Sequence, residues 1–214
     1  MKRSFSRGMV SGLFLVITSA ACSSATRMPA STGDRVIRTP AELVAADNGT
    51  PPYTEADVRF MSGMILHHAQ AVLIAGWAPT HGASSALRTL CERIVVAQQD
   101  EIAFMQRWLR QRDKPVPDAD ASHDMMPGMD HSNLMPGMLT AEQLTELDGA
   151  RGAEFDRLFL TYMIQHHEGA IAMVEQLFGA YGAAQDDDIF KLAADVNVDQ
   201  ITEIDRMRAM LAAL

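Results

Sequence analysis

The chain has 214 residues, of which 48% are hydrophobic and 21% are charged. This composition is sufficient for one compact core, and it excludes a chain that is disordered throughout. The 18 basic and 27 acidic side chains give a formal net charge of −9, which disfavours nucleic acid as a partner because phosphate backbones are also negative. The 15 methionines outnumber the eight phenylalanines, three tyrosines and two tryptophans combined, and this sulfur content needs an explanation.

The N-terminal segment has the pattern of an export signal. Lys2, Arg3 and Arg7 make its start positive, and the apolar stretch that follows is too short to span a bilayer. We therefore expect residues 1–21 to be a signal peptide. Its removal takes away these three basic side chains and leaves a formal charge of −12.

The two cysteines are expected to have different roles. Small residues precede Cys22, as in a bacterial lipobox, which predicts a lipidated cysteine and a membrane-anchored protein of the cell envelope that faces the periplasm or the cell exterior. Ordinary cleavage near Ala25 is the alternative. Residues 22–53 then form a tether without a role in the core. Cys91 has no remaining disulfide partner, so we expect it to be buried in a helix, with a role as a soft ligand as the alternative.

Helices, and no strands, are predicted after the tether. Thr54 can cap the first helix, Thr140 and Gln143 form a capping box for a short one, and a run of aspartates can cap the last. Apolar residues at spacings of three and four then predict long helices over residues 54–77, 84–112, 152–180 and 186–214. A short helix is expected to begin at residue 140.

The sequence repeats itself at an offset of 99 residues. Asp57, Phe60, Met64, His67, His68 and Ala71 recur as Asp156, Phe159, Met163, His166, His167 and Ala170. The partner helix repeats at an offset of 102, where Gln98, Glu101, Ile102, Met105 and Leu109 recur as Gln200, Glu203, Ile204, Met207 and Leu211. Two helical hairpins bury their apolar stripes most simply by packing together as a four-helix bundle. We therefore expect one domain over residues 54–214, with repeat one at 54–112, a linker at 113–139 and repeat two at 140–214.

Each copy places a thioether beside two imidazoles. Residues three and four apart are neighbours on a helix, so Met64 adjoins His67 and His68, as Met163 adjoins His166 and His167. Imidazole suits copper, zinc or nickel, whereas a thioether is a soft ligand that selects Cu(I) and Ag(I). The combination favours copper. The alternative is that the histidine pairs only stabilise the bundle through hydrogen bonds.

The partner helices carry polar residues that can support such a site. A carboxylate that points into a bundle is costly unless it is paired, so we expect Glu101 and Glu203 to accept hydrogen bonds from the histidines and orient them, with Gln98 and Gln200 beside them. The alternative places both glutamates at the bundle edge in water. Met105 and Met207 are expected to pack in the core.

The linker is the second concentration of sulfur. Its two Met-Pro-Gly-Met units cannot be a helix core, so packing does not explain its methionines. A soft cation could be captured there by His123, Met125, Met126, Met129, His131, Met135 and Met138. The alternative is a low-complexity loop without a ligand. His81 is expected to be only a loop histidine.

Taken together, these motifs resemble the bacterial family known as domain of unknown function 305, whose members are ferritin-like four-helix bundles. The resemblance covers residues 54–214 and rests on the paired histidines and on the Gln, Glu, Ile and Met positions of the partner helices. It implies copper binding and copper tolerance in the cell envelope. It also implies that Met173, the family's later methionine, joins the metal ligands, whereas the first copy has Ile74 there.

The expected function is therefore that of an exported, lipid-anchored protein, not an enzyme, that sequesters or transfers copper. Cu(I) is the favoured ion, Cu(II) a further one and silver a surrogate, and a copper-handling protein could be a partner. A ferritin-like metalloenzyme is one alternative, which is disfavoured because no Glu-x-x-His motif occurs in the chain. A structural or interaction lipoprotein without bound metal is the other.

Overall fold

The structure is a computed structural model of the chain that describes residues 52–119 and 135–214. The signal peptide, Cys22 and most of the tether lie outside these residues, so the predictions made for them stay predictions. The same holds for five of the seven linker residues, namely His123, Met125, Met126, Met129 and His131.

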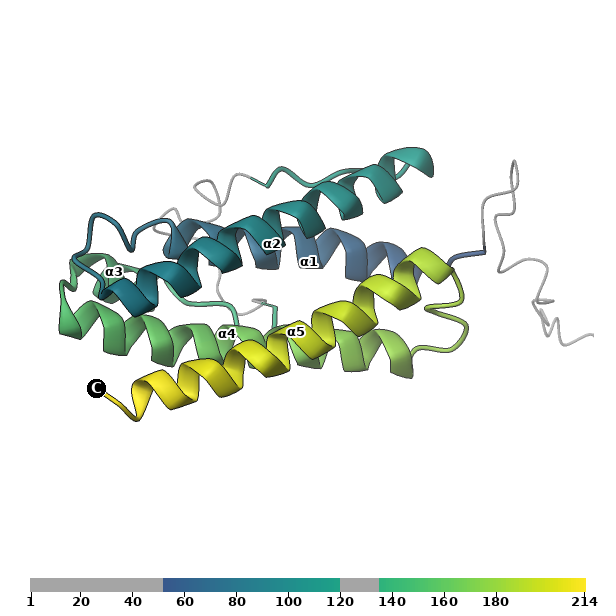
Figure 1. Cartoon of the computed structure of the whole chain (residues 1–214). Helices are drawn as coiled ribbons and strands as arrows, with labels where there is room; N and C mark the ends of the chain where they lie inside the picture. Colours follow the sequence, from purple (N-terminus) through teal and green to yellow (C-terminus); the bar gives the residue numbers. More distant parts are fainter. Residues whose placement is uncertain (1–51, 120–134) are drawn as a thin grey trace, which may run out of the picture. The chain divides into compact units, whose positions relative to one another are not determined.

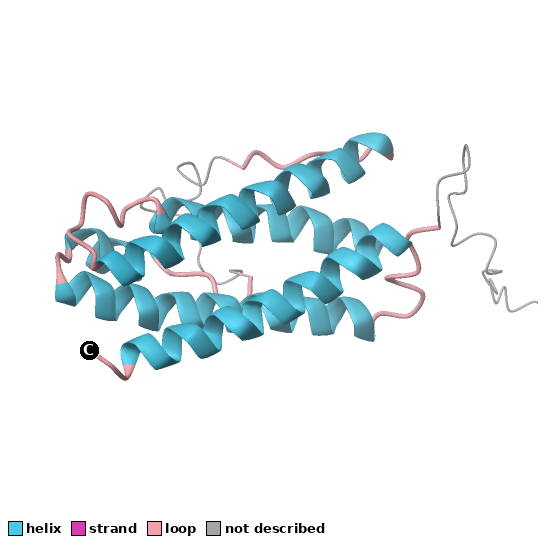
Figure 2. Cartoon of the chain, viewed as in Figure 1, coloured by secondary structure: helices cyan, strands magenta, loops and turns pink. Residues whose placement is uncertain are grey.

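The described residues form helices and no strands, as the sequence predicted (Figures 1 and 2). The helices are α1 (Glu55–Ala75), α2 (Ser85–Gln111), α3 (Ala141–Gly149), α4 (Ala153–Gly179) and α5 (Asp187–Leu211). Helix α1 packs against α2, α4 packs against α5, and α1 also packs against α4 (Figure 1). The all-α bundle of two helical hairpins is thereby confirmed. No described helix is long and apolar enough to cross a membrane.

Side-chain caps determine where most helices begin. The predicted caps are present: Thr54 and Asp57 form a capping box on α1, Thr140 and Gln143 form a second one on α3, and Asp186 caps α5. Ser84 caps α2 in addition. The C-terminal ends of α1 and α5 differ from the prediction by two and three residues. At the end of α1, the backbone N–H of Gly76 bonds back to carbonyls of the last turn, and a turn containing Pro79 follows.

The two hairpins are held together by a pair of symmetry-related aspartates. Asp57 at the start of α1 accepts a hydrogen bond of 2.7 Å from the backbone N–H of Ala184, which precedes α5. Asp156 at the start of α4 accepts bonds of 3.2 Å from the backbone N–H of Ser84, which precedes α2. Each repeat therefore fixes the loop that opens the second helix of the other repeat, which explains why both aspartates are buried.

The core is made of two apolar clusters that include the expected methionines. Met105 lies in one cluster with Trp108, and Met207 lies in the other with Cys91. Burial of Cys91 agrees with the prediction, and this burial raises the pKa of its thiol to about 12. Tyr53 corrects the boundary of the tether, because its ring packs edge-on against Trp108 at 5.4 Å and thereby contributes to the core.

The end of the linker is built into the bundle. Gln70 on α1 bonds both the N–H and the C=O of Leu139. At the equivalent position of α4, Gly169 lies so close to the backbone of Pro136 that a Cβ on it would come within 2.0 Å of the Pro136 oxygen. One repeat thus supplies hydrogen bonds to the linker, and the other leaves the space that the linker needs.

Candidate functional site

Four fully buried histidines, two from each repeat, meet where α1 packs against α4. His67 and His68 lie on α1, and His166 and His167 lie on α4. The ring centroids of His67 and His166 are only 3.8 Å apart, whereas the rings within each pair are 6.4 and 6.3 Å apart. The sequence left open whether the two pairs are separate, and the structure brings them together into one cluster of imidazoles.

The partner helices supply the glutamates that were expected to bond the histidines. His68 Nε2 lies 2.7 Å from Glu101 Oε2 on α2, and His167 Nε2 lies 2.6 Å from Glu203 Oε2 on α5. An ionised carboxylate can only accept, so each imidazole carries its proton on Nε2. The predicted pairing is therefore present in both repeats. It leaves the Nδ1 atom of each ring without a hydrogen-bond partner among the described residues.

The other two histidines show where the repeats differ. His67 Nε2 donates to the carbonyl oxygen of Pro136 at 3.0 Å, which again leaves Nδ1 without a proton. His166 has no partner on either ring nitrogen among the described residues. Burial, together with the neighbouring imidazoles, lowers the pKa of His67 to about 3 and the pKa of His166 well below its ordinary value. Both rings are therefore neutral at physiological pH and can act as ligands.

The feature shared by the four imidazoles is an unused nitrogen. Within the described part of the chain, the buried Nδ1 atoms of all four have no hydrogen-bond partner. Buried polar atoms rarely remain unpaired, because each such atom costs free energy. A cation that accepts nitrogen lone pairs would satisfy these atoms, so the donor set fits a borderline or soft metal ion as cargo.

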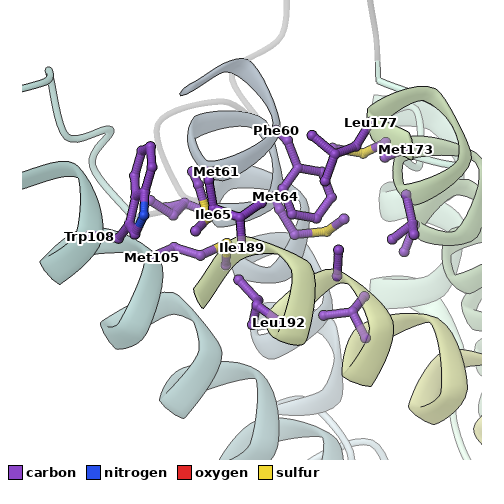
Figure 3. Packing of buried hydrophobic residues seen from close by; sticks show 14 of the residues in the cluster. Phe60, Met61, Met64, Ile65, Met105, Trp108, Met173, Leu177, Ile189 and Leu192 are labelled. Carbon is purple, nitrogen blue, oxygen red and sulfur yellow. The ribbon is translucent and has the colours of Figure 1, made fainter. Parts of the chain in front are cut away.

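No three His, Cys, Asp or Glu side chains of the described residues already converge on one point, so a soft ion would also have to draw on sulfur. Met64 and Met163, one turn before the histidines, are fully buried in different apolar clusters. Met173 lies in the same cluster as Met64, and Figure 3 shows both among the apolar side chains. Helix spacing places Met64 and Met163 one turn from the histidines, and Met173 shares the apolar cluster of Met64.

Met173 and one further methionine, Met135, line a groove at the surface. Met173 lies on α4 and Met135 at the end of the linker, and the groove, which Pro136 also lines, has a volume of about 270 Å³. Met135 Sδ and Met173 Cε lie 3.2 and 3.3 Å from the position that a Cβ of Gly63 would occupy. The two methionine side chains thus meet over Gly63. Met138, the last predicted linker ligand, is half-buried after the turn that follows Met135.

The glutamines behave differently from the glutamates. Gln98 and Gln200 are buried, as expected for residues beside the site. Neither forms a hydrogen bond with a histidine in the described residues, and both amide atoms of Gln98 and the amide oxygen of Gln200 have no partner there. They line a cavity of about 290 Å³ between α2 and α5. Their predicted role in orienting the histidines is therefore not visible as a contact.

His81 lies in the loop after α1 as expected, but it is buried and fully bonded. Its Nε2 lies 3.1 Å from Asp148, and its Nδ1 lies 3.0 Å from the carbonyl oxygen of Trp77. This histidine joins the α1–α2 loop to the end of α3 and has no unused nitrogen. Sequence reasoning also missed Gln70 and Gly169 as the residues that seat the linker, although they occupy equivalent positions two residues beyond the histidine pairs.

Comparisons with known proteins give a family and a set of solved structures. The family model described as a domain of unknown function (DUF305) matches residues 57–211. No match was found among curated proteins. A DUF305 fragment from Deinococcus radiodurans is 27% identical, with a TM-score of 0.64 over 77% of this chain and 100% of that one. A DUF305 protein from Streptomyces coelicolor, described as a candidate secreted protein, is 26% identical, with a TM-score of 0.62 over 74% and 93%.

A third similar structure carries a metal. CopM in its Cu(II)-bound form is 28% identical to this chain, with a TM-score of 0.59 over 73% of this chain and 96% of that one. CopM has also been solved with Cu(I), at a TM-score of 0.55, and with silver, at 0.54.

Proposed function

The chain belongs to the DUF305 family, and from this premise we propose that it is a copper-binding protein of the cell envelope that sequesters or transfers Cu(I) and also binds Cu(II). The observation that carries the proposal is the set of four buried imidazoles whose Nδ1 atoms have no partner in the described structure. Copper- and silver-bound CopM structures support it, because this chain shares their fold at 26 to 28% identity.

Each part of the site has a distinct role in this proposal. The imidazoles of His67, His68, His166 and His167 bind the ion, and the thioethers of Met64, Met163 and Met173 make the site soft enough for Cu(I). Glu101 and Glu203 hold two of the rings in the tautomer that directs Nδ1 at the ion. The Met- and His-containing linker captures ions from solution and delivers them to the bundle.

The proposal includes a location. A signal peptide and a lipid on Cys22 would place the bundle at the membrane, outside the cytoplasm, where it would contribute to copper tolerance. Support for export comes from the N-terminal sequence pattern. Sequestration or transfer needs no catalytic group, and accordingly we assign none.

The test separates metal binding from folding. In the full mature chain, His166→Asn with His167→Asn should weaken Ag(I) and Cu(I) affinity by about tenfold or more, as loss of ligands does. The metal-free bundle should lose only about 1 to 2 kcal/mol of stability, because only one of the four ring nitrogens that are removed, His167 Nε2, has a hydrogen-bond partner in the described structure. Competition titrations with a chromogenic chelator give the affinity, and thermal unfolding gives the stability.

His81→Asn is the matched control, since His81 is equally buried but has both nitrogens bonded. This variant should lose stability and keep the parental metal affinity. If the double variant of His166 and His167 behaves in the same way as the control, the histidine cluster is structural and the copper proposal fails.

A further inference from the structure

Exposed aromatic side chains gather at one end of the bundle. Phe178 at the end of α4 is 44% exposed, Tyr181 in the following turn is 92% exposed, and Phe190 at the start of α5 is 56% exposed. The rings of Phe178 and Phe190 contact each other edge-on at a centroid distance of 5.7 Å. No other aromatic side chain in the described ranges is exposed to this degree. We call these three residues the aromatic turn.

The fold does not account for the aromatic turn. Most of a ring's stabilising effect comes from burial, and these rings remain largely in water. The equivalent turn of the first repeat, between α1 and α2, has one aromatic residue, Trp77, which is half-buried and stacked on His81. An exposed aromatic turn is therefore not a requirement of the repeated hairpin, and it belongs to one end of this bundle.

The N-terminal chain enters the bundle at the same end. The described chain begins at Pro52, and Asp57 in the first turn of α1 accepts a hydrogen bond from Ala184, three residues after Tyr181. A Cβ on Gly182 would lie 3.7 Å from Thr54, the cap of α1. Figure 1 shows the start of α1 beside the loop between α4 and α5. The segment that leads back to Cys22 is thus joined to the bundle next to the aromatic turn.

We propose that the aromatic turn docks onto the bilayer to which the chain is tethered, with its rings at the boundary between headgroups and acyl chains. This inference rests on the lipid anchor of the proposed function. The 30 residues from Cys22 to Pro51 span at most about 100 Å, so the anchor keeps the bundle close to the bilayer. The end of the bundle nearest the attachment point then meets the membrane at a high effective concentration.

Tyr181 has the apolar ring body and polar tip that favour the membrane interface, and Phe178 and Phe190 supply apolar rings that can enter the boundary with the acyl chains. Anionic lipids should not strengthen the docking, because three of the basic residues at this end are already held in ion pairs. Arg112 pairs with Asp186, Lys114 with Glu55 and Lys191 with Asp195. The first turn of α5 also carries Asp187 and Asp188, so we expect a preference for zwitterionic surfaces.

The test uses the full mature chain with Cys22→Ala, so that no lipid anchors it, and vesicles of pure phosphatidylcholine. We expect the protein to co-float with the vesicles at millimolar lipid, and at least fivefold less of it to do so when Phe178→Ser, Tyr181→Ser and Phe190→Ser are combined. Addition of phosphatidylglycerol should not increase binding. The matched control combines Val96→Ser, Val198→Ser and Ile201→Ser, three exposed apolar residues on the sides of α2 and α5, and should bind like its parent.

Three results would overturn the proposal: no binding by the Cys22→Ala protein, equal binding by the serine variant of the aromatic turn, or a dimer in sedimentation that this variant abolishes. These outcomes are separable from failure of the proposed function. The anchor is read from the mass of the N-terminal peptide, which should carry a lipid in the Cys22 protein and none in Cys22→Ala. Copper binding is read from the Ag(I) affinity, which the serine variant should leave unchanged.

Discussion

The buried histidines show how a single hydrogen bond sets the chemistry of a ring. Glu101, Glu203 and the Pro136 carbonyl each accept a hydrogen bond from the Nε2 of one imidazole, and the buried Nδ1 atoms of these three rings have no partner in the described structure. His166 has no such partner, so either of its nitrogens can turn toward an ion. It is the ring with the fewest hydrogen bonds at the site, and it lies against His67 from the other repeat.

The methionines can be divided by their surroundings. Met135 and Met173 meet over Gly63 in a groove, whereas Met105 and Met207 are enclosed by apolar side chains. We predict that Met135→Leu with Met173→Leu will lower Ag(I) and Cu(I) affinity severalfold, because two thioether ligands are lost. Met105→Leu with Met207→Leu should leave the affinity unchanged. Each Met→Leu exchange conserves volume and costs less than about 1.5 kcal/mol, so both variants fold.

Isothermal titration with Ag(I), with chelator competition for Cu(I), measures this difference. If the Met105 and Met207 variant loses as much affinity as the Met135 and Met173 variant, the groove has no special part in binding.

The helices and their pairing were largely predictable from the sequence. Caps such as Thr54 and Thr140 are local signals that act within one turn, and the helices begin beside them. The repeat at an offset of 99 residues predicted two like hairpins, which fixed the fold class. Helix ends were less certain, because the end of α1 depends on how the following turn bonds to it.

The path of the linker could not be predicted in this way. It depends on Gln70 bonding Leu139 and on Gly169 leaving room for Pro136, which are contacts between segments about 30 to 70 residues apart. The same is true of the meeting of His67 and His166. The repeat placed each histidine pair on a helix, but the distance between the pairs is set by the packing of α1 on α4.

Asp57 and Asp156 join the two hairpins through hydrogen bonds to the backbone. We predict that Asp57→Ala and Asp156→Ala will each lower the free energy of unfolding by about 1 to 3 kcal/mol, because a backbone N–H on the opposite hairpin loses its acceptor. Asp205→Ala, an exposed position on α5, should change stability by less than about 0.5 kcal/mol. Urea denaturation followed by circular dichroism checks this, and equal effects of all three substitutions would contradict it.

At the scale of the whole molecule, the proposed copper site is divided between the repeats. Each repeat supplies two imidazoles, one glutamate that holds a ring and one fully buried methionine, and the nearest rings of the two repeats are 3.8 Å apart. Under this proposal, the internal duplication builds one centre from two halves. An ion bound there would link the hairpins directly, in addition to the aspartate bonds between them.

This arrangement predicts that metal binding stabilises the bundle as a unit. An ion that binds only the folded state at 100 times its dissociation constant adds about 2.7 kcal/mol, which corresponds to a rise in Tm of about 5 to 10 °C for a chain of this size. We expect Ag(I) to raise the Tm of the parent in a single cooperative transition. We also expect His67→Asn with His68→Asn to abolish the rise as fully as His166→Asn with His167→Asn, since either change removes half of one shared centre. Scanning calorimetry with and without Ag(I) measures the rise in Tm, and titration calorimetry measures the amount of bound silver. If each double variant keeps half of the bound silver at parental affinity, the repeats hold two independent sites.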